Sequence, residues 1–282
     1  MNEATAVSAW PLMLFTLAVM LGALRLMAQP RLLARRRQRQ SASAFPAAWR
    51  RILRRRVPLV ARLPAHLQLR LKRHVQVFIA EKPFIGCQGQ EITDEVRVTI
   101  AAQACLLLLG FDKPDFYPRL KEVLVYPGAF VVEREQTVGS GDGPGVVRGQ
   151  RQALSGESWS QGRVVLSWAD ALAGAADPHD ARNVVVHEFA HQIDQDDGTA
   201  NGRPWRATPL LRRRWQRVMD AAFARLQHAP SEVIDVYGAT DPAEFFAVAS
   251  EVFFERPADL AAEAPEVYRE FSALYGLNPA QW

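Results

Sequence analysis

The chain has 282 residues, of which 49% are hydrophobic and 23% charged. This composition is ordinary for a globular protein, so we do not expect the chain to be disordered. Two cysteines are too few for the disulfide framework of a small secreted protein. The net charge of +4 is unevenly divided, because residues 1–73 carry fifteen Lys and Arg against a single acid, Glu3. The N-terminal part is therefore basic and the remainder acidic, which indicates two separate regions of the molecule.

Residues 4–24 contain no charged side chain and are predicted to form one apolar helix. At about 1.5 Å per residue, about twenty residues just cross a hydrocarbon core of roughly 30 Å. The alternatives are a buried helix of a cytoplasmic protein and a cleaved signal peptide, but a signal peptide needs positive charge before its apolar core. Here arginines follow the apolar stretch, so the positive-inside rule predicts a single-pass inner-membrane protein with a cytoplasmic C-terminal part.

We accordingly expect a transmembrane anchor at residues 1–27, a basic juxtamembrane linker at residues 28–60 and a globular domain at residues 61–282. Gln, Ser, Ala and Arg are mixed in residues 35–47, as in a flexible linker. The arginines of residues 50–56 favour attraction to anionic lipid, because no known nucleic-acid motif or interleaved aromatic side chain accompanies them. Nucleic acid is therefore not the expected partner.

The globular part is predicted to be helix-rich, with short strands between the helices. Apolar residues at helical spacing, together with start and stop signals, predict helices at residues 67–79, 93–109, 210–226, 242–255 and 257–275. Short apolar runs predict strands at residues 84–87, 123–126, 130–132 and 164–166. Residues 139–145 are expected to be a glycine-rich loop, and the edge of the strand at 164–166 is expected to hold an extended peptide.

An apolar run leads into a His-Glu-x-x-His motif. His187 and His191 are four residues apart, so a helix places both on one face, where two imidazoles can bind one zinc ion. Glu188 lies beside them and is the candidate general base for water activated by the metal. A chance match on a buried helix is the alternative, but the small Ala190 and the apolar residues 184–186 favour the metal site.

Zinc in a catalytic site needs a third protein ligand, with the fourth position open to water. Asp194 adjoins the same helix, where a ligand would strain the tetrahedral geometry, so we expect it to orient a ligand or to cap the helix. Glu244 fits a helix-capping acid, but its apolar neighbours turn it inward, where an unpartnered carboxylate is costly and a metal ion would stabilise it. Glu251 is the alternative third ligand, or an acceptor for a ligand histidine.

Two blocks, residues 187–191 and residues 237–246, resemble the Mlc titration factor A family of zinc peptidases, with similarity from about residue 62 to the C-terminus. They also resemble the catalytic domain of anthrax lethal factor. The resemblance implies an α+β, gluzincin-type zinc peptidase domain at residues 61–282, helix-rich with a small mixed sheet, that cleaves peptide or protein substrates. It also implies one Zn2+ per chain, with the metal ligands His187, His191 and Glu244, the general base Glu188 and the transition-state hydrogen-bond donor Tyr237.

Soluble members of this family are linked to binding the glucose-responsive repressor Mlc. The alternative function is therefore a regulatory protein that binds a transcriptional repressor, with a mainly structural zinc site. An open coordination position beside Glu188 favours the enzyme, because a structural site would be closed. The resemblance does not extend to residues 1–56, so it does not identify the partner of a membrane-tethered form, and DNA binding by the basic segment is a third hypothesis.

Overall fold

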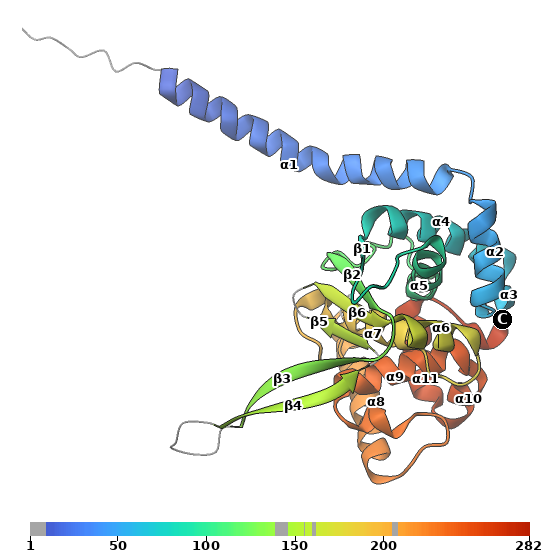
Figure 1. Ribbon diagram of the computed structural model, residues 1–282. Helices are drawn as coiled ribbons and strands as arrows, with labels where there is room; N and C mark the ends of the chain where they lie inside the picture. The colour runs from blue at the N-terminus through green and yellow to red at the C-terminus, as the bar shows by residue number, and fades with distance from the viewer. Residues whose placement is uncertain (1–9, 139–145, 155, 160–161, 205–207) are drawn as a thin grey trace, which may run out of the picture. The chain divides into compact units, whose positions relative to one another are not determined.

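The computed structural model describes residues 10–138, 146–154, 156–159, 162–204 and 208–282 (Figure 1). The chain divides into two compact units, Met1–Ala44 and Phe45–Trp282. The described part of the first unit is the helix α1 (Trp10–Ala42) and the two residues after it. The second unit contains the remaining helices and all the strands.

α1 is longer than the apolar stretch that predicts it. It extends for 33 residues, from Trp10 to Ala42, and therefore includes most of the segment expected to be a flexible linker. Ala, Gln and Arg, which dominate that segment, are good helix formers, so the helix continues where the apolar side chains stop. The large apolar side chains described between Trp10 and Leu33 are exposed, and Met13–Ala42 is long and apolar enough to cross a membrane. Residues 4–9 of the predicted helix lie outside the described part.

Residues 45–60, which were expected to belong to the linker, are part of the second compact unit. They form α2 (Ala47–Arg56) and the first turn of α3 (Leu59–Arg62). Leu53 and Val57 are buried in the core of this unit, while Arg55 and Arg56 form ion pairs with Glu95 on α5. The arginines dominate the local sequence and concealed the apolar stripe that fixes this segment to the globular unit.

The main sheet is small and mixed, as predicted. Its four strands lie in the order β1 (Phe84–Gly86), β2 (Glu122–Tyr126), β6 (Arg163–Ser167) and β5 (Gly156–Trp159). β1, β2 and β6 are parallel, and β5 pairs antiparallel with β6. Both edges of β6 are therefore paired, and the expectation that β6 holds an extended peptide at its edge is wrong. β5, which the sequence did not reveal, is the outer strand beside it.

A second, two-stranded sheet consists of β3 (Phe130–Val138) and β4 (Val146–Leu154), which are antiparallel. β3 extends beyond the short strand expected at residues 130–132, and β4 was not expected. The predicted glycine-rich loop at residues 139–145 lies outside the described part of the chain.

The helix α7 (Val184–Asp194) lies at the centre of the second unit. It contacts α5 (Asp94–Leu106), α6 (Trp168–Ala176), α9 (Pro242–Glu255) and the strands β5 and β6. α4 (Ala65–Glu81) packs against α5, so the side of α7 that faces α5 is covered by two helices. Phe189 of α7 is fully buried there against Phe78 and Tyr117, with ring centroids 5.6 and 4.8 Å away.

The C-terminal helices cover the core on the side of α9. They are α8 (Pro209–His228), α10 (Pro257–Glu263) and α11 (Pro265–Tyr275). The expectation of a single helix at residues 257–275 is wrong, because this segment divides at Ala264 into α10 and α11. Pro265 has no N–H group and disfavours a helical conformation at the preceding residue, where φ is −132° and ψ is 67°.

A partly buried histidine on α4, His74, makes the folding stability of the chain dependent on pH. Burial and the charge of Arg70 lower the pKa of His74 from 6.5 to about 4. Below pH 6.5 the unfolded chain therefore binds a proton that the folded chain rejects, so stability falls as the pH decreases toward 4. We expect His74→Phe, which keeps a ring against Phe116, to reduce this loss by roughly 1–3 kcal/mol in urea unfolding at a series of pH values.

His66→Phe is the matched control, because His66 is exposed on the same helix. If wild-type protein, His74→Phe and His66→Phe all lost the same stability between neutral pH and pH 4, the assignment to His74 would be contradicted.

Candidate metal centre

The start of α7 is fixed by Asn183. Its side-chain oxygen accepts a hydrogen bond from the Val186 N–H at 3.0 Å, which makes Asn183 the N-cap. Its own backbone N–H donates to Glu251, and its side-chain amide donates to Glu255 at 2.8 Å. Both glutamates belong to α9, so one residue sets where α7 begins and how it meets α9.

Three side chains from α7 and α9 meet at one point. The Nε2 atoms of His187 and His191 are 3.2 Å apart, and the nearer oxygen of Glu244 lies 3.0 and 3.6 Å from them. Ligands at about 2.1 Å from a tetrahedral zinc ion would be separated by about 3.4 Å, which is close to these distances. The three residues form a group that could hold a metal ion.

Glu251 lies behind this group, two turns after Glu244. Its carboxylate is 2.8 Å from Nδ1 of His187, while Nε2 of the same ring faces Glu244. Glu251 therefore orients the imidazole and leaves Nε2 directed at the candidate metal position. Of the two third-ligand candidates, Glu244 is the one that the structure brings to both histidines.

The cluster favours positive charge. Burial lowers the pKa of His187, but hydrogen bonds to Glu244 and Glu251 outweigh it and raise that pKa well above its usual range. Burial likewise raises the pKa of Glu244, yet its hydrogen bonds to the two imidazoles bring it well below its usual range. A proton or a divalent cation can supply the charge that these groups stabilise, and the two compete for the same nitrogen atoms.

The two predicted catalytic side chains lie beside the cluster. Glu188 follows His187 on α7 and is buried. Tyr237 belongs to the 3₁₀ helix η2 (Val236–Ala239), whose N-cap Asp235 accepts a hydrogen bond from the Tyr237 N–H at 2.9 Å. The Tyr237 ring lies 6.0 Å from the His187 ring, centroid to centroid, and is 48% exposed, so it can reach a molecule that enters from solvent.

Asp194 takes no part in the three-residue group. It is buried and accepts hydrogen bonds from the N–H groups of Asn201 and Gly202, both at 2.7 Å, and burial raises its pKa to about 6. Gly202 has φ +69°, and a Cβ there would lie 2.2 Å from the carbonyl oxygen of Pro242. Asp194 thus holds the loop after α7 against the first residue of α9.

Sequence reasoning missed the roles of Asn183 and Glu255. An Asn before an apolar helical run is a recognisable N-cap signal. The glutamates that it contacts lie 68 and 72 residues further along the chain, so no local pattern could reveal those contacts.

Comparisons with known proteins find relatives along most of the chain. The family described as glucose-regulated metallo-peptidase M90 matches residues 32–276. An uncharacterized protein of Synechocystis sp. is 39% identical over 240 residues, which cover 83% of this chain and 86% of that protein. Mlc titration factor A of Cronobacter sakazakii is 36% identical over 250 residues, which cover 85% of this chain and 89% of that protein. The chain belongs to the Mlc titration factor A family.

Membership in the Mlc titration factor A family confirms the resemblance based on the two sequence blocks. Mlc titration factor A of Salmonella agona is 37% identical over 237 residues, which cover 80% of this chain and 84% of that protein. The family match begins at residue 32, earlier than the resemblance had suggested, and includes α2 and α3. A metallo-peptidase family and a His-His-Glu group that could hold a metal are consistent with each other.

The role of Glu251 can be tested through metal affinity. We expect Glu251→Gln to weaken Zn2+ binding about 10–100-fold, because His187 loses the carboxylate that orients its ring. The affinity is measured by competition with a chelating dye. Glu255→Gln is the matched control on the same helix, because the glutamine keeps an oxygen that can accept the hydrogen bond from Asn183 and so leaves α7 joined to α9. Equal affinity in Glu251→Gln and wild-type protein would contradict the role.

Proposed function

We propose that the protein is a gluzincin-type zinc peptidase that hydrolyses peptide bonds in peptide or protein substrates. The observation that carries the proposal is the group of His187, His191 and Glu244, whose ligand atoms lie within 4.8 Å of one another. Two imidazoles and one carboxylate are a ligand set of catalytic zinc sites. His187, His191 and Glu244 are the proposed ligands of one Zn2+ per chain.

The surrounding residues suit peptide hydrolysis. Zinc bound at this point would polarise the substrate carbonyl and lower the pKa of water. Glu188 accepts the proton from the attacking water and returns it to the leaving amine. Tyr237 donates a hydrogen bond to the oxyanion that develops on the carbonyl. Glu188 is buried and follows the proposed ligand His187 on α7, which supports its position beside the attacking water.

The outer strand β5 is the proposed site for the substrate backbone. It contacts α7 and, among the described strands, pairs only with β6. An extended peptide can add to such an edge through main-chain hydrogen bonds. A substrate held there would lie near the helix that carries the histidines.

We further propose that α1 is a single-pass inner-membrane anchor, with the peptidase unit in the cytoplasm. The exposed apolar side chains of α1 and the arginines that follow them support this arrangement. A transcriptional repressor is a second candidate partner, supported by the name Mlc titration factor A that relatives carry.

Two variants separate metal binding from catalysis. We expect Glu188→Gln to retain zinc and lose turnover, because the ligands are intact and the base is gone, whereas His187→Ala loses the metal. Zinc content is measured by atomic emission, and hydrolysis of a fluorogenic peptide library is measured with and without chelator. Unchanged hydrolysis in either variant would refute the proposal, as would hydrolysis that persists after chelation.

The tyrosine gives an independent test. Tyr237→Phe removes one donor to the oxyanion, so kcat is expected to fall about 100- to 1000-fold with zinc content unchanged. Tyr268→Phe is the control, since the Tyr268 hydroxyl bonds to Asn278. Equal kcat values in the two variants would exclude Tyr237 from catalysis.

A further inference from the structure

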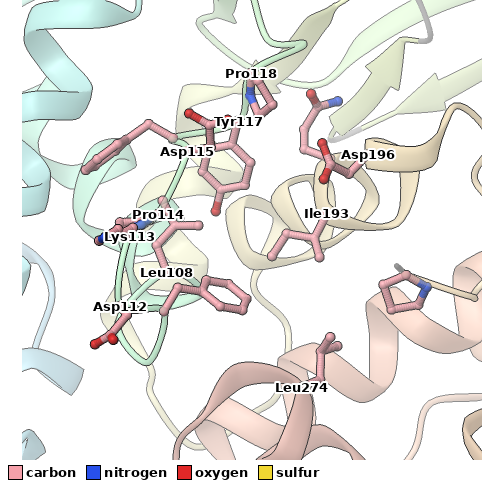
Figure 2. A pocket seen from close by; sticks show the side chains of 14 residues that line it. Leu108, Asp112, Lys113, Pro114, Asp115, Tyr117, Pro118, Ile193, Asp196 and Leu274 are labelled. Carbon is pink, nitrogen blue, oxygen red and sulfur yellow. The ribbon is translucent and has the colours of Figure 1, made fainter. Parts of the chain in front are cut away.

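A cavity of about 430 Å³ lies beside the C-terminal half of α7 (Figure 2). Its lining includes the buried apolar side chains of Leu108, Phe116 and Leu274, and Ile193 projects into it from α7. At 100° per residue, Ile193 lies on a face of α7 well away from His187 and His191. None of the proposed zinc ligands or catalytic residues lines this cavity.

Four of the residues that line the cavity are charged and exposed, and they are called its rim here. The rim consists of Asp112, Lys113, Asp115 and Asp196, all of which are exposed. Three acids against one lysine give the rim a net negative charge. The buried side chains of the lining are mainly apolar and its exposed side chains include three acids, so the lining offers two kinds of contact.

The wall next to Ile193 is held in a fixed conformation. Phe116 and Tyr117 have φ values of 50° and 55°, a region that bulky side chains rarely adopt. The hydroxyl of Tyr117 donates to the Ala104 carbonyl at 2.6 Å, and the buried ammonium of Lys82 donates to the Tyr117 carbonyl at 2.7 Å. The cavity is therefore formed before any ligand arrives, which reduces the entropic cost of binding.

We propose that this cavity is a binding site for a small ligand with an apolar body and a positively charged end. The volume lies within the range of small-molecule sites, about 300–1,000 Å³. Leu108, Phe116 and Leu274 contact the apolar body, while the acids of the rim attract the cationic end. An anion of the same shape is disfavoured by the same rim.

A ligand in this cavity would contact the metal helix directly. Ile193 and Gln192 line the cavity, and Tyr117 of its wall packs against Phe189, which lies between the two histidines in the sequence. The site is therefore separate from the metal position but adjoins the helix that carries it.

The test is isothermal titration calorimetry of the zinc-loaded full chain in nanodiscs of neutral lipid, with empty nanodiscs as the blank. The probes are 4-phenylbutylamine, its neutral alcohol analogue and its carboxylate analogue. We expect one saturable site, with affinity decreasing from amine to alcohol to carboxylate. The proposal would be overturned if the amine showed no saturable binding, or if it bound no more tightly than the carboxylate.

Variants of the lining residues test whether the probe binds in this cavity. Ile193→Phe fills the cavity and is expected to weaken the amine and the alcohol at least about tenfold. The double variant Asp112→Asn, Asp196→Asn is expected to weaken the amine at least about threefold and to leave the alcohol unchanged. Glu91→Gln, an exposed acid outside the cavity, is the control and should change neither.

Two results would overturn the assignment. The first is that the amine binds wild-type protein, Ile193→Phe and the double Asp→Asn variant with the same affinity. The other is amine binding that disappears on zinc chelation but persists in Ile193→Phe, because the probe would then bind at the metal. The double variant changes exposed side chains only, so it tests the site even where Ile193→Phe alters folding.

Discussion

The contact between α7 and α9 is the interaction on which the metal centre depends. Glu251 meets His187 and the backbone of Asn183, and Asn183 in turn caps α7 and reaches Glu255. At the other end of α7, Asp194 holds the loop that packs against the start of α9. Two helices that are far apart in the chain are thus joined at both ends, which fixes His191 and Glu244 opposite each other.

This arrangement concentrates acidic groups in a buried region. Burial and the charge of Glu251 together raise the pKa of Glu255 to about 8. Burial also raises the pKa of Glu251. Removing such groups from water costs free energy that a nearby positive charge offsets. Glu244 and Glu251 contact the His187 ring directly, so a cation held at the histidines would stabilise the charged forms of both carboxylates.

Much of the site could be predicted because its signals are local. The four-residue spacing of the histidines, the helix start at residue 242 and the inward-facing Glu244 are each visible within a few residues of sequence. The partner of Asn183 and the pairing of β5 with β6 depend on contacts between distant segments, so they were not visible. The arginines of α2 concealed Leu53 and Val57 in the sequence, so the globular domain was expected to begin at residue 61, whereas the compact unit begins at Phe45.

The most direct test of the account is a crystal structure of the zinc-loaded protein with anomalous scattering measured on both sides of the zinc absorption edge. We predict a single zinc peak with His187, His191 and Glu244 as its protein ligands, each at about 2.0–2.2 Å, and with a fourth position open to solvent. No peak at this point, or a zinc ion bound by Asp194 or Glu251 in place of Glu244, would contradict the account.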